Sequence, residues 1–180
     1  MANFQSPKSV SSTLMSSETH VPKSLASRTP GSLTIDERAN FCFGCGPDNP
    51  QSLHLSFQLD SADPQNITAT ATVNLTRLHQ GPPGYLHGGI IAVLMDEAMS
   101  KLNRPLDVLA MTRNMEVDYL RPAPIDTPLR LVARHLRRDG RKLYHSAELI
   151  HPDGTVLARA KGFFLVINPS VIDPSVLAPS

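Results

Sequence analysis

Apolar and polar residues alternate along much of the chain. The alternation covers residues 53–59, where four apolar side chains are separated by polar ones, and residues 67–75, where threonines and an asparagine separate the apolar positions. A period of two predicts strands that are buried on one face and pair with antiparallel neighbours. Four later segments also have the pattern of strands, and they span residues 108–120, 129–137, 142–150 and 156–167.

One segment has helical periodicity instead. The turn formers of residues 81–84 precede it and Pro105 follows it. Because proline disfavours helical geometry in the residue before it, we predict one helix over residues 88–104. Its apolar positions recur at the i, i+3, i+4 spacing of a buried helix face, and they are Ile91, Leu94, Met95, Ala98 and Leu102.

The order of the predicted elements indicates the fold class. Two strands precede the helix and four strands follow it, with turn signals at Asp139-Gly140 and Asp153-Gly154. Runs of strands with a single helix are typical of an α+β layer fold. The helix carries the only large apolar stripe that can fill a curved sheet. We therefore predict a curved antiparallel sheet of about six strands around one long central helix.

The start of the predicted helix lacks an ordinary capping residue. No Ser, Thr, Asp or Asn stands there, and His87-Gly88-Gly89 takes the place of a cap. Free amide N–H groups at a helix start favour negative charge, and glycines leave room for a ligand beside the backbone. Two interpretations stay open at this point: close packing of the glycines, or a site for an anion or an oxyanion.

Asp96 lies on the side of the helix nearly opposite the apolar stripe. Taken alone, it is most simply a solvated carboxylate. It can take part in chemistry only if something covers that side, and we expect a second subunit to do so because one small sheet cannot surround a helix. The neighbouring Glu97 and Lys101 have the spacing of an ordinary i,i+4 ion pair.

Composition excludes several classes of protein. The chain has 180 residues, of which 41% are hydrophobic, and a formal net charge of +1. This near-neutral charge argues against a nucleic-acid binder that relies on bulk electrostatics. No apolar run approaches the roughly 20 residues that span a bilayer. Two cysteines make no disulfide framework, so we expect a reducing compartment, the cytoplasm.

The predicted domain boundaries follow from composition. Residues 1–35 are rich in Ser and Thr and poor in large apolar residues, so burial cannot offset their ordering entropy. We predict a disordered tail there; the alternative is an organelle transit peptide, which would direct the protein to an organelle matrix. Residues 36–168 are expected to form the folded domain, and residues 169–180 a flexible C-terminal tail.

Cys42 and Cys45 have the C-x-x-C spacing that invites a metal or redox interpretation. Zinc normally takes four protein ligands in structural sites, and the chain has no second cysteine pair. We favour packing as the role of the two cysteines. A zinc site shared across a dimer axis and a redox pair are the alternatives, and we predict neither a metal nor a cofactor.

Four motifs together resemble a known family. They are CFGCGPDNP at residues 42–50, HQGPPGYLHGGIIAVLMDEA at residues 79–98, NMEVDYLRP at residues 114–122 and DGRK at residues 139–142. From about residue 41 to residue 169 the chain resembles hotdog-fold acyl-CoA thioesterases, the group that includes phenylacetyl-CoA-pathway enzymes and human acyl-CoA thioesterases. The resemblance implies a hotdog fold and hydrolysis of acyl-CoA to a free acid and CoA.

The resemblance also implies roles for single residues. Asp96, nine residues after His87, matches the family's general base or nucleophile. The backbone N–H of Gly88 matches the oxyanion donor, His87 a positioning or polarising group, and Thr112 a residue that orients the water or the carboxylate. The substrate contacts implied are Gly89, Asp118, Arg141, Lys142 and Ser146, with Arg141 and Lys142 at the CoA phosphates. Some relatives carry Asn where this chain has Gly81, which argues against an amide-assisted mechanism.

The implied partners are an acyl-CoA substrate and a second copy of the chain, as a homodimer or a dimer of dimers, with no nucleic acid and no membrane span. Gly88 and Asp96 are about 12 Å apart along one helix, so we expect Asp96 of one subunit to act with His87 and Gly88 of another. Two alternatives remain: a noncatalytic acyl-CoA binding module, and a hotdog hydratase or dehydratase that leaves the thioester intact.

Overall fold

The computed structural model describes residues 40–168. The predicted tails, residues 1–35 and 169–180, lie outside the described residues, as do the first four residues of the predicted domain.

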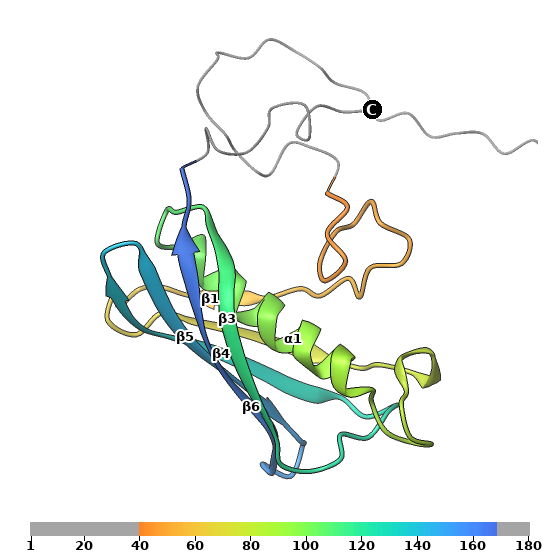
Figure 1. The fold of residues 1–180 in the computed structure, drawn as a ribbon. Helices are drawn as coiled ribbons and strands as arrows, with labels where there is room; N and C mark the ends of the chain where they lie inside the picture. The colour runs from red at the N-terminus through yellow and green to blue at the C-terminus, as the bar shows by residue number, and fades with distance from the viewer. Residues whose placement is uncertain (1–39, 169–180) are drawn as a thin grey trace, which may run out of the picture. The chain divides into compact units, whose positions relative to one another are not determined.

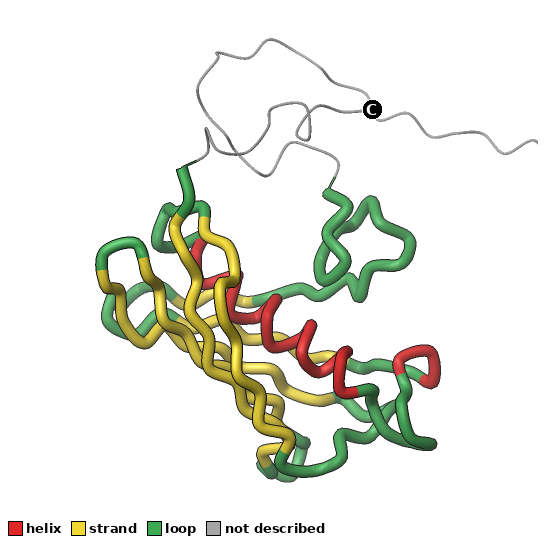
Figure 2. Tube along the Cα trace, viewed as in Figure 1, coloured by secondary structure: helices red, strands yellow, loops and turns green. Residues whose placement is uncertain are grey.

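The fold is one antiparallel sheet with a helix against one of its faces (Figures 1 and 2). The helix is α1 (Gly88–Ser100), and the strand order across the sheet is β1-β2-β4-β5-β6-β3. This arrangement confirms the predicted curved sheet of six strands around one helix. The strands are β1 (Gln58–Asp60), β2 (Thr68–Val73), β3 (Ala110–Tyr119), β4 (Leu129–Asp139), β5 (Lys142–Ile150) and β6 (Val156–Val166).

Two elements differ from the sequence prediction. Strand β1 is shorter, because the backbone N–H groups of Leu53 and Leu55 donate to the carbonyls of Phe43 and Gly44 in the preceding loop rather than to a strand. The α-helix ends at Ser100, and its last turn tightens into the 3₁₀ helix η3 (Lys101–Asn103). A second 3₁₀ helix, η2 (Arg77–His79), precedes the glycine-rich loop.

The core lies between α1 and the sheet. All five residues of the predicted helix stripe are buried, and so are the apolar residues that alternate along β2. Met99 is fully buried, as expected for a core residue, whereas Tyr85 is 43% exposed. The turn predictions are also confirmed, because Gly140 and Gly154 have φ values of +53° and +90°, which favour glycine.

A β-bulge in β3 determines which of its side chains face the helix. Thr112 pairs with Phe164 of β6, and Asn114 pairs with the next residue, Phe163, so Arg113 is the extra residue. Phe164 is fully buried against the helix side of the sheet. The bulge therefore puts Thr112 on the same face as Tyr119, whose hydroxyl contacts the start of α1.

Candidate functional site

The side chain of His87 caps the start of α1. Its Nδ1 accepts a hydrogen bond from the backbone N–H of Gly89 at 2.9 Å, which corrects the expectation of an uncapped start. A ring nitrogen that accepts carries no proton, so we assign the proton to Nε2. His87 is exposed. Its Nε2–H is thus available to donate to a ligand, while the N–H of Gly89 is already engaged.

A closed loop holds His87 in place. The backbone N–H of His87 donates to the carbonyl of His79 at 2.9 Å, and that of Gly81 donates to Tyr85 at 3.0 Å. A β-carbon at Gly81 would lie 3.1 Å from the Cα of His87, which is a tight contact with backbone. The close approach of these two chain segments therefore leaves little room for a side chain at position 81.

Gly88 presents the free backbone N–H of the helix start. Among residues 40–168 this N–H has no hydrogen-bond partner. The carbonyl of Gly88 accepts a hydrogen bond from the Tyr119 hydroxyl at 3.1 Å. Strand β3 thus anchors the helix start, and an unpaired donor remains at the end of the helix where the dipole is positive.

The side chain of Asp96 is hydrogen-bonded to the side chain of Thr112. The Thr112 hydroxyl donates to Asp96 Oδ1 at 2.6 Å. Within the described residues, Oδ2 of Asp96 has no hydrogen-bond partner. One carboxylate oxygen is therefore held by a hydroxyl, and the other is available to accept a proton from water.

The two halves of the site are separated within one chain. Gly88 and Asp96 stand about two helical turns apart, or about 12 Å along the axis. Among the described residues 40–168, strand β3, which carries Thr112, pairs only with β6 and so lies at the edge of the sheet. Met111 and Tyr119 of this strand are 56% and 54% exposed. This open edge lies directly beside Asp96.

Arg141 and Lys142 lie at the turn between β4 and β5, exposed to solvent. The Arg141 side chain is partly engaged, because its Nε donates to the carbonyl of Val166 at 3.0 Å. Lys142 Nζ lies 6.0 Å from the centre of the Phe163 ring. The ammonium group of Lys142 and the terminal nitrogens of Arg141 form a positive group at this turn.

Asp118 and Ser146 lie on the other face of the sheet. In register, Asp118 pairs with Arg159, and Ser146 pairs with Lys161. Both partners are exposed on the side of the sheet that does not contact α1. Within one chain the structure therefore does not bring Asp118 or Ser146 together with Asp96.

Two residues near the site were missed in the sequence interpretation. Tyr119 was quoted only as part of a motif, yet it anchors Gly88. The sequence interpretation treats Glu97 only as a member of an ordinary i,i+4 ion pair, yet this residue is only 9% exposed. Its ion pair with Lys101 is present, at 2.7 Å. No signal in the helix pattern reveals the burial of Glu97, because a distant loop covers it.

The sheet and the central helix define a hotdog-fold domain, and solved thioesterases share this fold. Residues 83–158 match the family model of the thioesterase superfamily. The resemblance to hotdog-fold thioesterases that the sequence motifs indicate is thereby confirmed.

Individual relatives agree with this assignment. Acyl-coenzyme A thioesterase THEM4 from Xenopus laevis is 31% identical over 91 residues, which are 50% of this chain and 41% of that protein. A thioesterase superfamily protein of known crystal structure is 30% identical, with a TM-score of 0.64, over 70% of this chain and 60% of its own. The match to THEM4 spans less than half of that protein's length.

A more distant structure was solved with a ligand. The protein smu.793 from Streptococcus mutans, bound to acetyl-CoA, has a TM-score of 0.55 and 17% identity over 63% of this chain and 90% of its own. At this identity the similarity concerns the fold. Within residues 40–168 of the present chain, no helix has both the length and the apolar character needed to cross a membrane.

Proposed function

We propose that this protein hydrolyses acyl-CoA thioesters to a free acid and CoA. The observation that carries the proposal is the hydrogen bond of 2.6 Å from Thr112 to Asp96 Oδ1, which leaves Oδ2 of the same carboxylate without a partner among residues 40–168. A carboxylate oriented in this way can take a proton from an attacking water, and such general-base catalysis contributes roughly 10²–10⁴-fold to rate. The same oxygen can instead attack the carbonyl as a nucleophile.

The helix start supplies the complementary chemistry. Attack on a thioester builds negative charge on the carbonyl oxygen. The N–H of Gly88 is a fixed donor at the positive end of α1, so it is suited to stabilise that charge. In this proposal the Nε2–H of His87 polarises the same carbonyl or positions the thioester.

The active site is proposed to form between two subunits. The 12 Å between Gly88 and Asp96 within one helix is too long for both groups to act on one carbonyl. The exposed edge of β3 beside Asp96 is where a second copy of the chain would bring its own His87 and Gly88. A homodimer, or a dimer of dimers, is thus proposed as the active assembly.

A thiol-trapping assay with an acyl-CoA panel, run beside a binding measurement, tests the reaction. We expect CoA release at enzymatic rates, with kcat lost in Asp96→Asn while binding is retained. Glu148→Gln, which removes a half-buried carboxylate paired with Arg159, should behave as wild type. Tight binding without CoA release would indicate the binding module, and addition of water to the acyl chain would indicate the hydratase.

Subunit mixing tests the shared site. Gly88→Pro removes one N–H without breaking the helix, because proline is favoured in the first turn and His87 already has the extended ψ of 138° that proline requires of its predecessor. Mixed Asp96→Asn and Gly88→Pro subunits should regain roughly one quarter of wild-type activity if they exchange at random into two-fold dimers.

The matched control is Gly88→Ala, which keeps the N–H. Its new β-carbon would lie 3.6 Å from the nearest atom, Tyr119 Cε1, which is an ordinary contact. Gly88→Ala should therefore retain most activity, while Gly88→Pro should lose about 10²–10³-fold in kcat. If mixed subunits regained nothing although hybrids were present by mass spectrometry, the shared site would be refuted.

The remaining assignments concern binding and location. Arg141 and Lys142 are proposed to contact CoA phosphates, because a guanidinium and an ammonium suit phosphate. Gly89 is kept as a proposed substrate contact. Asp118 and Ser146 are proposed to contact substrate only in an assembly that brings the outer face of one subunit's sheet to the site of another subunit.

Cytoplasm is the proposed compartment, with an organelle matrix as the alternative if residues 1–35 are cleaved. The intact mass of native protein would reveal such cleavage.

A further inference from the structure

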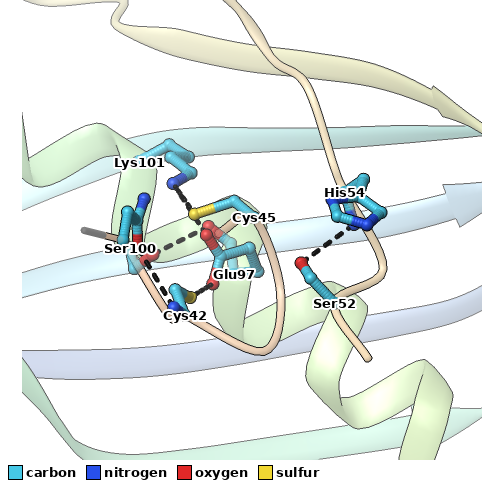
Figure 3. Close-up of polar contacts among 8 residues, drawn as sticks. Cys42, Cys45, Ser52, His54, Glu97, Ser100 and Lys101 are labelled. Atoms are coloured by element: carbon cyan, nitrogen blue, oxygen red, sulfur yellow. Dashed lines mark hydrogen bonds and ion pairs between the residues drawn. The ribbon is translucent and has the colours of Figure 1, made fainter. Parts of the chain in front are cut away.

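A cluster of thiols, a carboxylate and an ammonium group lies beside α1, outside the site described above. Cys42 and Cys45 come from the loop that precedes β1, Glu97 comes from α1, and Lys101 comes from η3. Figure 3 shows these four side chains pointing toward one another. The two sulfurs and a Glu97 oxygen all lie within 4.8 Å of one another.

The contacts within this cluster are short. Cys42 Sγ lies 3.5 Å from Glu97 Oε2. Lys101 Nζ lies 2.8 Å from Cys45 Sγ and 2.7 Å from Glu97 Oε1. An ammonium group therefore already sits between a sulfur and a carboxylate oxygen, so the cluster favours positive charge.

The loop is built to close over Glu97. A β-carbon at Gly44 would lie 2.5 Å from Glu97 Oε2, so a side chain fits at position 44 only if the side chain of Glu97 shifts. The backbone N–H of Gly46 donates to the carbonyl of Cys42 at 2.8 Å, which closes the turn. The C-x-x-C segment is thus held in one geometry, with both sulfurs on the side of the carboxylate.

Charge in the cluster is balanced by the lysine. Burial opposes ionisation of Glu97, but hydrogen bonds from Cys45 and Lys101 outweigh it and lower the pKa of Glu97. Burial likewise opposes the charge of Lys101, while its contacts with Cys45 and Glu97 raise its pKa. Burial and the nearby Glu97 raise the pKa of the Cys45 thiol to about 11.

We propose that Cys42, Cys45 and Glu97 bind one Zn²⁺ ion, with water as the fourth ligand and Lys101 displaced to the edge of the site. Thiolates favour zinc among the common divalent ions. The sequence interpretation considered the two cysteines without a third ligand. That ligand, Glu97, lies on α1, 52 residues after Cys45 in the chain.

The geometry suits a tetrahedral ion. Zinc–sulfur bonds of about 2.3 Å and zinc–oxygen bonds of about 2.0–2.2 Å put ligand atoms roughly 3.5–3.8 Å apart. The 3.5 Å between Cys42 Sγ and Glu97 Oε2 is already in this range. Both cysteines are half-buried rather than sealed, so an ion can enter and a water can complete the coordination.

Binding must release protons. Two thiols give up their protons to become thiolate ligands, and Glu97 is already ionised, so zinc binding frees up to two protons and weakens as pH falls. The two thiolates, the carboxylate and Zn²⁺ sum to one negative charge, which Lys101 balances. The ion would hold the loop of residues 40–53 against α1 one residue away from Asp96, with three protein ligands and one water rather than the four protein ligands of a closed structural site.

Cobalt titration of the full-length protein tests this site. The protein is reduced, stripped with a chelator, desalted without oxygen and titrated with Co²⁺. We expect one equivalent to bind, with a thiolate-to-cobalt charge-transfer band and the intense visible bands of a tetrahedral site, and Zn²⁺ should displace it. Zinc should also raise the Tm and protect both thiols from alkylation, as measured by mass spectrometry.

Variants assign the ligands. Cys42→Ser and Cys45→Ser should each abolish the charge-transfer band or halve it, and Glu97→Gln should weaken binding roughly 10–100-fold or more while the thiols remain. Glu148→Gln removes a carboxylate outside the cluster, so it is the matched control and should bind metal as wild type does. Should a cysteine variant fail to fold, Glu97→Gln and the wild-type alkylation test still decide.

Three results would overturn the proposal. The first is the absence of stoichiometric Co²⁺ or Zn²⁺ binding by folded wild-type protein, with both thiols alkylated equally fast whether or not zinc is present. The second is metal binding that survives in both cysteine variants, which would place the ion elsewhere. The third is a wild-type chain that forms only a Cys42–Cys45 disulfide and never retains metal.

Discussion

Thr112 holds one oxygen of Asp96 through a single hydroxyl, on a strand whose bulge turns that hydroxyl toward the helix. Loss of a hydrogen bond to a charged group costs about 1.5–3 kcal/mol of free energy. This hydrogen bond controls the orientation of the Asp96 carboxylate. It contributes little to the stability of the fold, because both residues are accessible to solvent.

Thr112→Val should therefore lower kcat roughly 10–100-fold, which is the loss of about 1.5–3 kcal/mol expressed as a rate. The substitution keeps the shape and the strand propensity of the side chain. Thr112→Ser, which keeps the hydroxyl, should remain within a few-fold of wild type. The measurement is kcat and KM by CoA release, and equal losses in Val and Ser would contradict the assigned role.

His145 is a buried imidazole in the core. It is fully buried, its Nε2 lies 3.2 Å from Asn103 Oδ1, and its Nδ1 lies 3.2 Å from Nδ1 of His135. Burial, and then the nearby His135, lower the pKa of His145 from 6.5 to about 3. The folded protein therefore keeps this ring neutral under conditions in which an unfolded chain would protonate it.

This difference predicts the pH dependence of stability. Between pH about 3 and 6.5 the unfolded chain binds more protons at His145 than the folded one, so the free energy of unfolding rises with pH there. It should fall by up to about 1.4 kcal/mol for each pH unit below 6.5. Urea unfolding across this range, compared with His145→Gln, isolates the contribution. The control His54→Gln, at an exposed histidine, should keep the wild-type slope.

At the scale of the element, α1 carries three separate features along its length. Its apolar stripe fills the core, its start offers an N–H at Gly88, and its flank carries Asp96 and Glu97. The capping role of His87 links the start of the helix to the candidate site, because the same imidazole accepts from the Gly89 N–H through Nδ1 and leaves Nε2–H for a ligand. Stability and chemistry at this position can be separated, since asparagine is also a good cap.

His87→Asn should leave the free energy of unfolding within a few tenths of a kcal/mol of wild type, yet reduce kcat. His87→Ala should reduce kcat similarly and also destabilise the protein by about 1 kcal/mol through loss of the cap. Urea unfolding and CoA-release kinetics on both variants provide the check. A fully active His87→Asn would mean that the residue serves only as a cap.

At the scale of the whole molecule, one folded chain does not complete the proposed site. The exposed edge of β3 leaves the side of the helix at Asp96 open to a second chain. Each chain holds the Asp96–Thr112 pair and the Gly88 N–H, but at places about 12 Å apart along α1. The proposed assembly joins the halves from two chains. Catalysis should therefore depend on protein concentration in a way that folding does not.

Dilution tests this dependence. CoA release per chain should fall as the protein is diluted below the dissociation constant of the dimer, in parallel with the monomer fraction seen by sedimentation or mass photometry. Circular dichroism should stay unchanged if the monomer remains folded. A dilute monomer as active per chain as the dimer would rule out a site built from two subunits.

The pattern of the amino-acid sequence was enough to establish the helix, the run of strands and the core stripe, because period and breaker residues act locally. Asp96 and Thr112 were singled out only by the resemblance to hotdog-fold thioesterases, since the helix pattern alone leaves Asp96 a solvated carboxylate; the fold joins the two side chains by a hydrogen bond of 2.6 Å. The sequence pattern did not reveal that β1 is short, since Leu53 and Leu55 bond to a loop rather than to a strand.

Contacts between distant segments decided the rest. The His87 cap depends on the direction of a ring, which no propensity encodes. The burial of Glu97 depends on a loop more than 50 residues earlier in the chain that closes over it through Gly44. The faces on which Asp118 and Ser146 lie follow from the register of the strands. Such relations arise only when the chain packs, because side-chain direction and register are set by partners far away in sequence.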